Sequence, residues 1–321
     1  MALLILNDRE VEELLDTEGC IGAMEGALTG LARGEVHLPL RPVVRPPGEG
    51  SFMGLMPVHR GGERPQYGLK TICVFPDNPQ LGLDPHQGFV SLHDGETGQL
   101  RVLVNASAVT AIRTAAVSAL ATRTLARSGA RVCAIVGAGH QARAHVRALR
   151  ALPFERILVA SRTAEHARQL AAESAAEAAE TVEEAVRAAD VVCTVTSAAD
   201  PVVRREWLRP GTHLNAVGAC FPHTRELDSE TVAAAAFFVD RRESAENEAG
   251  DYLIPLQEGA IGEGHIRAEL GEVLIGAASG RESDDQLTVF ESLGLAVEDL
   301  AAAEYIAQRA RETGAGTEVE F

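Results

Sequence analysis

The chain has 321 residues, 46% hydrophobic and 23% charged, which is enough for two globular domains with hydrophobic cores. Its formal net charge of −17 at pH 7 repels phosphate backbones and anionic membranes, so we expect neither nucleic acid nor membrane as a partner. Five dispersed cysteines, and an N-terminus without a charged-then-apolar signal pattern, predict free thiols in a reducing cytoplasm.

The N-terminal third combines helices with a strand-rich module. Asn7 or Asp8 can cap a helix through "REVEELLD", and a second helical pattern continues to about Arg33. Between residues 36 and 103, short apolar runs such as "YGLKTICVF" and "LRVLVNA" are separated by Pro- and Gly-rich turns, and "DGETG" indicates a hairpin. We therefore predict an antiparallel sheet in this region.

The middle of the chain alternates between strands and helices. A long helix, "SAVTAIRTAAVSALATRTLARSG", ends at Gly129 and precedes this alternation. The alternation is typical of parallel βαβ units with helices on both faces of a sheet. The stretch "AAESAAEAAETVEEAVRAA" fits a solvated helix pair, and a final helix, "AVEDLAAAEYIAQRAR", precedes a polar tail that we expect to fray. We predict strands at 131–136, 156–161, 190–196, 212–217 and 236–240, and helices at about 140–151, 164–177 and 181–189.

A glycine-rich turn, "VGAGHQA", joins the first of these strands to its helix. Gly137 permits the tight turn, Gly139 lets the backbone approach a pyrophosphate, and Ala142 keeps the helix close to the strand. The helix N-terminus adds N–H groups and a positive dipole. We therefore predict a dinucleotide seat that includes His140 and Gln141; the alternative is a glycine turn without a ligand.

The end of the second predicted strand indicates which dinucleotide binds. An NAD-binding chain would carry an Asp or Glu there for the ribose 2′-hydroxyl, whereas this chain has Ser161, Arg162 and Thr163. A guanidinium pairs with a 2′-phosphate that a carboxylate would repel. We therefore favour NADP(H) over NAD(H). The alternative is that Arg162 is an ordinary surface residue.

Several further blocks, in order along the chain, complete a family resemblance. They are "LPLRPVV", "GLMP", "GLKTICVF", "TAIRTAAVSALAT", "NAVGACFPHTRELD" and "TVFESLGLAVED". With the glycine motif, they resemble the ornithine cyclodeaminase/mu-crystallin family over nearly the whole length. The resemblance implies an α/β fold in which residues 113–294 form a Rossmann NAD(P)-binding domain. Residues 1–112 and 295–321 would form an α+β substrate-binding and dimerisation domain, and a homodimer is expected.

The resemblance also implies which residues handle the substrate. Arg41 in "LPLRP" and Arg113 in "AIRTAA" match the two arginines that family members use on the substrate carboxylate. Lys70 in "GLKT" matches the active-site lysine, and Asp228 in "RELD" matches the acid/base aspartate. We also assign Met53 to substrate binding.

These residue types suit the chemistry of a 2-amino or 2-imino acid. Bidentate arginines can clamp the carboxylate, and a lysine close to two arginines has a lowered pKa and can act as acid or base. Each assignment has a structural alternative. Arg113 can be a structural ion-pair partner, Lys70 can point from a strand to solvent, and Asp228 can cap a helix that begins near Ser229.

The remaining assignments concern the cofactor. Thr196 and Ser197 lie at the end of a predicted strand, where a Rossmann loop meets the cofactor. The resemblance implies that the "NAVGA", "SLG" and "DPHQGF" segments lie near the nicotinamide, which selects Asn215, Ala216, Gly218, Leu293 and His86. His93 and His223 receive no role. The histidine spacing shows no His-Glu-x-x-His or similar ligand pattern, so we expect no metal site.

One position separates the branches of the family. Cyclodeaminases carry an acidic residue just before Leu-Met-Pro for the distal ammonium of the substrate, and they retain NAD; here that position is Gly54. Because a buried ammonium without a carboxylate is costly, the chain resembles the mu-crystallin branch, which reduces cyclic ketimines with NAD(P)H. The sequence thus predicts an NADPH-dependent imine reductase. Alternatives are an ornithine cyclodeaminase, an alanine-dehydrogenase-like or reductively aminating enzyme, and a non-catalytic NADPH-binding protein.

Overall fold

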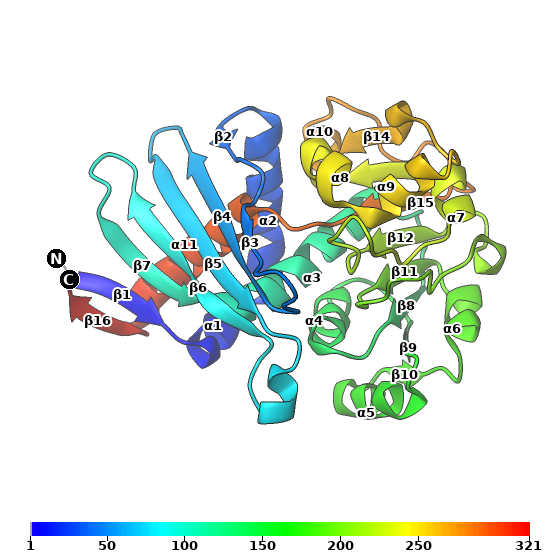
Figure 1. Cartoon of the computed structure of the whole chain (residues 1–321), viewed down its shortest axis with the longest axis horizontal. Helices are drawn as coiled ribbons and strands as arrows, with labels where there is room; N and C mark the ends of the chain where they lie inside the picture. Colours follow the sequence, from blue (N-terminus) through cyan, green and yellow to red (C-terminus); the bar gives the residue numbers. More distant parts are fainter. Residues whose placement is uncertain (1) are drawn as a thin grey trace. The chain divides into compact units, whose positions relative to one another are not determined.

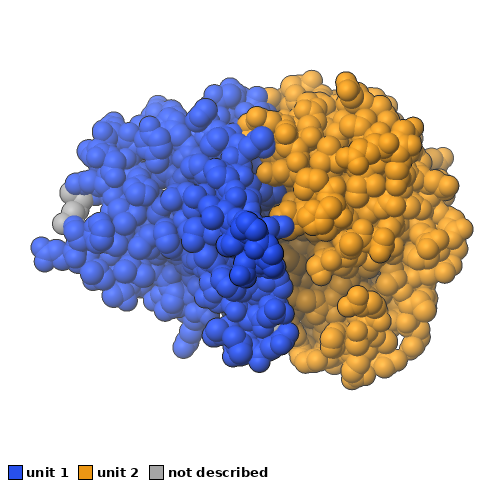
Figure 2. All heavy atoms as spheres, viewed as in Figure 1, with its two compact units in different colours: residues 1–113, 295–321 blue, residues 114–294 orange. Residues whose placement is uncertain are grey.

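The computed structural model describes residues 2–321, which form two compact units. Unit 1 comprises the chain up to residue 113 together with 295–321, and unit 2 comprises residues 114–294 (Figure 2). The chain leaves unit 1 inside helix α3 (Ala106–Leu125) and returns to it just before helix α11 (Ala296–Thr313). The two ends of the sequence therefore build one unit.

Unit 1 is built on one sheet with the strand order β16-β1-β7-β6-β5-β4-β2, and β3 pairs with β4. Strands β4 to β7 form an antiparallel meander, and the turn from β6 to β7 is the hairpin predicted from "DGETG". The strands are β1 (Ala2–Leu6), β2 (Val36–His37), β3 (Val43–Val44), β4 (Phe52–Arg60), β5 (Gln66–Val74), β6 (His86–Asp94), β7 (Leu100–Asn105) and β16 (Thr317–Glu320).

Helices cover one face of this sheet. Helix α11 packs on β4, β5 and β6, and α2 (Thr17–Ala32) packs on α11 (Figure 1). The register pairs Met56 with Lys70 and Lys70 with Val90, so these three buried side chains share the face that α11 covers. Helix α1 (Asp8–Leu14) begins as predicted, because the Asn7 side chain accepts the N–H of Glu10.

The prediction that the polar tail frays is wrong. Residues 317–320 form β16, which pairs antiparallel with β1. Gly314 and Gly316 adopt positive φ angles of 72° and 89°, which turn the chain back after α11. The side chains of β16 are exposed, so the strand is held by backbone pairing at the sheet edge rather than by a pattern that a sequence reveals.

Unit 2 is a parallel sheet with the strand order β10-β9-β8-β11-β12-β15-β13-β14, which confirms the predicted Rossmann-type architecture. The chain runs outward from β8 to β9 and β10 and then crosses to β11 on the other side of β8. Ligands of such sheets bind at the carboxyl ends of the strands where the order reverses, here β8 and β11. The strands are β8 (Val132–Val136), β9 (Arg156–Ala160), β10 (Glu177–Ala178), β11 (Val191–Thr194), β12 (His213–Ala216), β13 (Ala236–Val239), β14 (Ile266–Glu269) and β15 (Thr288–Glu291).

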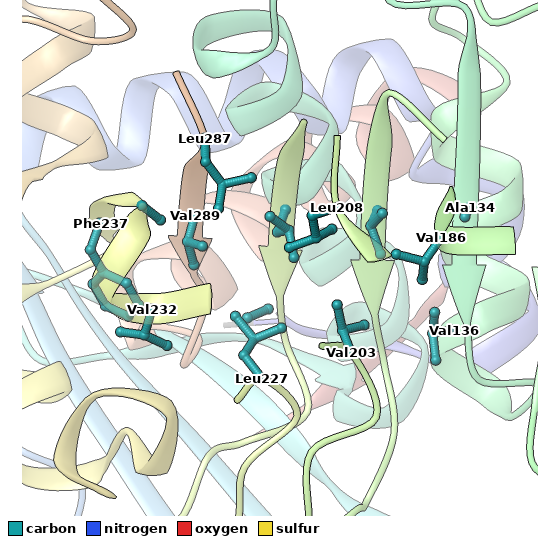
Figure 3. Packing of buried hydrophobic residues seen from close by; sticks show 14 of the residues in the cluster. Ala134, Val136, Val186, Val203, Leu208, Leu227, Val232, Phe237, Leu287 and Val289 are labelled. Atoms are coloured by element: carbon teal, nitrogen blue, oxygen red, sulfur yellow. The ribbon is translucent and has the colours of Figure 1, made fainter. Parts of the chain in front are cut away.

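Buried apolar side chains join the helices of unit 2 to its sheet. Val136 of β8, Val186 of α6, Phe237 of β13 and Val289 of β15 belong to one cluster (Figure 3). The Ala- and Glu-rich stretch contains the short strand β10 between α5 and α6, so it is not a plain helix pair. The helices are α4 (His140–Leu149), α5 (Ala164–Ser174), α6 (Val182–Ala188), α7 (Ser229–Ala234), α8 (Arg242–Glu248), α9 (Gly250–Gln257) and α10 (Leu270–Leu274). Within residues 2–321, no helix is both long and apolar enough to cross a membrane.

A buried histidine fixes the dinucleotide helix α4 against α3. His145 donates through Nδ1 to the carbonyl of Gln141 at 2.8 Å, so its Nε2 accepts the hydroxyl hydrogen bond of Ser118 at 2.9 Å. Burial lowers the pKa of His145 to about 4. The unfolded chain, with a pKa near the ordinary 6.5, therefore binds one more proton at this position between pH 6.5 and 4, and stability is lost as the pH falls through that window.

We predict that His145→Gln flattens this loss. The free energy of unfolding of the variant should fall less steeply than that of the wild type between pH 6 and 4.5, by about 1.4 kcal/mol per pH unit. Urea unfolding followed by circular dichroism at several pH values measures the two slopes. Parallel curves for the two proteins would contradict the assignment of a neutral, buried His145.

Candidate active site

A buried amine lies at the centre of the candidate site in unit 1. Lys70 lies in the middle of β5 and is 3% exposed, so the alternative in which it points to solvent is wrong. Its Nζ donates to Oδ1 of Asp299 at 3.0 Å. Burial lowers the pKa of Lys70 to about 8; the Asp299 carboxylate opposes the shift, and the charges of Arg113 and Arg41 add to it.

Arg113 of α3 joins this amine through the same carboxylate. Its Nε donates to Oδ1 of Asp299 at 3.1 Å, and its Nη1 donates to Oε2 of Glu298 at 2.8 Å. All four side chains are at least nine-tenths buried. Arg113 is therefore an ion-pair partner, as the structural alternative stated. Binding of a substrate carboxylate by its guanidinium stays a prediction.

The chain contains one lysine and 28 arginines. A guanidinium stays protonated at any physiological pH, whereas an amine with a pKa near 8 exchanges its proton close to neutrality. Lys70 is therefore the one side-chain cation of the sequence, apart from a protonated histidine, that can act as a proton donor and acceptor. It lies beside Arg113 and Asp299 rather than on the surface.

The other predicted substrate residues lie at different places in unit 1. Arg41 precedes β3 and is near enough to lower the pKa of Lys70 by its charge. Met53 pairs with Cys73 on the face opposite Lys70 and is 37% exposed, so the structure does not bring it together with the amine. Gly54 is buried on the face of Lys70, and a Cβ there would meet Ile72 at an ordinary 3.6 Å. A side chain at this position would project toward the side of the sheet that carries the amine.

Asp228 lies in unit 2 and caps a helix. It is the N-cap of α7, and its oxygens accept the backbone N–H of Thr231 at 2.9 Å and that of Arg205 at 3.1 and 3.2 Å. The capping role named as the alternative is therefore present. A role as acid or base stays a prediction for Asp228.

The glycine motif has the predicted geometry of a dinucleotide seat. Gly137 has a φ of 129°, and a Cβ there would lie 2.9 Å from the carbonyl oxygen of Val195. Gly139 is the N-cap of α4, and a Cβ there would meet nothing within 4 Å, so the backbone is open toward a ligand. Ala142 is fully buried. With the first N–H groups of α4, these residues fit a pyrophosphate; His140 at the start of the helix is exposed.

The end of β9 presents the residues predicted to select the cofactor. The Ser161 hydroxyl donates to the carbonyl of Thr163 at 2.6 Å, which closes a tight turn before α5. Arg162 and Thr163 are exposed at this turn. The turn therefore displays a guanidinium where an NAD-type chain displays a carboxylate.

The other predicted cofactor residues of unit 2 differ in accessibility. Thr196, Ser197 and Gly218 follow β11 and β12 and are partly or fully exposed. Asn215 is buried, and its amide donates to Thr122 of α3 at 3.0 Å. Ala216 is buried in the core cluster, and Leu293 is buried while its N–H donates to Asp240 at 2.7 Å. For Asn215, Ala216 and Leu293, contact with a cofactor through the side chain stays a prediction.

The histidines and a pocket of unit 1 lie elsewhere. His86 begins β6 near Asp84, with Nδ1 3.7 Å from the carboxylate. His93 lines a pocket of about 1000 Å³ between α2, α11 and the end of the β4–β5 hairpin, which contains no predicted site residue. The His223 ring stacks on Phe221 in unit 2. Among the described residues, no group of three His, Cys, Asp or Glu side chains is placed to hold a metal ion.

Sequence analysis missed Glu298 and Asp299. They are adjacent acids in the first turn of α11. Acidic residues are common there because the positive N-terminal end of the helix dipole stabilises negative charge. The available signal was their apolar surroundings in the sequence, because Ala296, Val297 and Leu300 flank the two acids and all three are buried. Glu226, which is fully buried in unit 2, was also missed although it belongs to the "RELD" block.

The chain is similar to known proteins over nearly its whole length. Residues 1–314 match the model of the ornithine cyclodeaminase/mu-crystallin family. Ketimine reductase mu-crystallin of Mus musculus is 38% identical over 308 residues, which cover 94% of this chain and 95% of that protein. Thermococcus litoralis Δ1-pyrroline-2-carboxylate reductase, solved with NADH and L-proline, has a TM-score of 0.93 at 35% identity and covers 99% of this chain and 100% of its own. An archaeal alanine dehydrogenase dimer with bound NAD has a TM-score of 0.93 at 32% identity over 100% of both chains.

The single lysine allows its pKa to be measured directly. In protein labelled with ¹³Cε-lysine, one ¹H–¹³C signal should titrate with a midpoint near pH 8 rather than 10.5. Asp299→Asn removes the anion that supports the charged amine, so the midpoint should move further down. A wild-type midpoint near 10.5, or no shift in a folded Asp299→Asn variant, would contradict the cluster described above.

Proposed function

The chain belongs to the ornithine cyclodeaminase/mu-crystallin family, and from this premise we propose that it is an oxidoreductase that reduces a 2-imino carboxylate to the amino acid with NADPH. The substrates that fit are cyclic ketimines of the Δ1-piperideine-2-carboxylate or Δ1-pyrroline-2-carboxylate type. The observation that carries the proposal is the buried Lys70, the one lysine of the chain, with a pKa of about 8 beside Arg113 and Asp299.

Each residue then has a defined task. Arg41 and Arg113 hold the substrate carboxylate, and the bonds from Arg113 to Glu298 and Asp299 orient its guanidinium before substrate arrives. The protonated Lys70 donates a proton to the substrate nitrogen, and Asp299 holds the amine in place. Asp228 is a second proton donor by resemblance to the family. When bound, the reduced nicotinamide supplies the hydride that goes to the imine carbon.

The cofactor and the assembly follow from the same premise. Unit 2 binds a nicotinamide cofactor at the turn of Gly137 and Gly139, and Arg162 selects NADPH over NADH by pairing with the 2′-phosphate. The active form is a homodimer. Exposed apolar side chains on the sheet face opposite Lys70 support it, namely Ile5, Met53, Tyr67 and Phe89, and the similar archaeal alanine dehydrogenase is a dimer.

A second candidate is an alanine-dehydrogenase-like enzyme that aminates a 2-oxo acid reductively. The similarity to the archaeal alanine dehydrogenase favours it. An ornithine cyclodeaminase is disfavoured, because Gly54 offers no carboxylate on the face of Lys70.

The decisive assay follows the loss of NADPH absorbance with Δ1-piperideine-2-carboxylate and Δ1-pyrroline-2-carboxylate. We expect rapid oxidation, and Lys70→Arg should reduce kcat by about 100-fold or more with a smaller change in KM, since arginine keeps the charge but gives no proton. Parallel reactions use pyruvate with ammonia, and L-ornithine with NAD scored for proline and ammonia. Turnover in one of these reactions, and not with the imines, would reject the proposal.

Cofactor preference is tested at Arg162. Arg162→Ala should lower the preference for NADPH over NADH, measured as the ratio of kcat/KM values, by about 10-fold or more, because one charge-assisted contact is lost. Arg168→Ala is the matched control, since Arg168 is an exposed arginine of α5 that pairs with Glu165 and Glu180. Equal ratios in wild type and Arg162→Ala would show that this guanidinium does not select the cofactor.

A further inference from the structure

One buried carboxylate in unit 2 joins two loops. Glu226 is fully buried, and its Oε1 accepts both the backbone N–H and the hydroxyl of Thr196, each at 2.6 Å. Its Oε2 accepts the backbone N–H of Gly218 at 2.7 Å. Thr196 follows β11 and Gly218 follows β12, so a single side chain ties together the loops that leave two adjacent strands at their carboxyl ends.

The two loops approach each other so closely that only glycine fits at one of them. A Cβ at Gly218 would lie 1.9 Å from the carbonyl oxygen of Thr196 and 2.7 Å from the Glu226 carboxylate. The contact with the Thr196 carbonyl would require the backbone to move, because that oxygen belongs to the main chain. The arrangement of these loops around Glu226 is therefore tightly defined.

The backbone of Glu226 is itself anchored. Oδ1 of Asp251, in the first turn of α9, accepts the N–H groups of Glu226 and Leu227 at 3.0 and 2.8 Å. The carbonyl of Glu226 accepts the N–H groups of Val202 and Val203 at 2.8 and 3.0 Å. Leu227 and Val203 pack in the core cluster (Figure 3). The carboxylate thus projects from a fixed point of the core.

Neighbouring acids differ from Glu226 in their partners. Burial raises the pKa of all three acids: that of Asp251 to about 8, that of Glu291 well above its usual range, and that of Glu226 despite its hydrogen bonds from Thr196 and Gly218. Within residues 2–321, neither carboxyl oxygen of Glu291 has a hydrogen-bond partner. Glu226 instead receives three donors, and in this group of acids it alone connects the two loops.

We propose that Glu226 is a positioning residue that holds the loops after β11 and β12 in the conformation that receives the nicotinamide cofactor. The inference rests on the proposed function, because Thr196, Ser197 and Gly218 are predicted cofactor residues. Glu226 itself touches no cofactor; it acts through the backbone N–H groups that it binds.

The test measures NADPH binding by fluorescence titration in full-length protein, with turnover as a second readout. Glu226→Gln keeps the size of the side chain but places an amide donor against one of the N–H groups, which releases one loop. We expect the Kd for NADPH to rise about 10-fold or more, and kcat at saturating NADPH to change by less than about threefold. Glu226→Asp keeps the charge but shortens the reach, and the same rise in Kd is expected.

Glu291→Gln is the matched control, because it makes the same substitution in the same buried group of acids, and the Glu291 carboxyl group forms no hydrogen bond to either loop. It should leave the Kd for NADPH within about twofold of the wild type. A purely structural role would lower the Tm of Glu226→Gln without changing the Kd of the folded protein.

At least one of the two Glu226 variants must fold for the test. The inference is overturned if a folded variant binds NADPH with the same Kd as the wild type. It is also overturned if Glu291→Gln weakens binding to the same extent. Wild-type protein that binds neither NADPH nor NADH would overturn the proposed function, and this inference with it; normal wild-type binding isolates the role of Glu226.

Discussion

The buried charge of Lys70 constrains how the segments of unit 1 come together. A lysine ammonium removed from water is tolerated only where anions and hydrogen-bond acceptors replace the lost hydration. For Lys70, the anion is Asp299, whose Oδ1 also accepts a hydrogen bond from Arg113. These three residues come from β5, α3 and α11, so the cluster is complete only when residues 295–321 have returned to the sheet. The path of the chain, out to unit 2 and back, is thereby tied to the chemistry of a single side chain.

The arginines and the single lysine of the chain differ in how their charge responds to pH. The 28 arginines carry charge that does not vary with pH. Some of them, such as Arg156 and Arg187, pair with surface acids, and Arg113 pairs with the buried Glu298 and Asp299. The single lysine is placed where burial brings its pKa to about 8, on the helix-covered face of the sheet. An imine reduction needs both kinds of group: permanent charge to orient a carboxylate, and an exchangeable proton for nitrogen.

The sequence predicts those structural features that depend on interactions between neighbouring residues. The turn at Gly137 and Gly139, the Asn7 cap and the β6–β7 hairpin each depend on a few neighbouring residues, and each is present as expected. The placement of Glu298 and Asp299 depends on which side of α11 meets the sheet, which no local pattern specifies.

Strand register limits the prediction in the same way. Met53 and Lys70 lie on opposite faces because of the pairing of β4 with β5, and this pairing is not visible in either strand alone. For Asp228, the helix-cap pattern and the acid/base motif coincide, so the sequence supports both roles equally.

A common physical device holds both units at the places where chemistry is expected. A carboxylate has two oxygens, each able to accept more than one hydrogen bond, so one buried acid can join segments that are far apart in sequence. Asp299 joins two cations, Glu226 joins two loops, and Asp240 accepts the N–H groups of Leu293 and Gly294, both at 2.7 Å. Several donors on each carboxylate offset its desolvation, which no single donor would do. Buried acids in this acidic chain thus differ from those on its surface, because each of them fixes the positions of several donors from different segments.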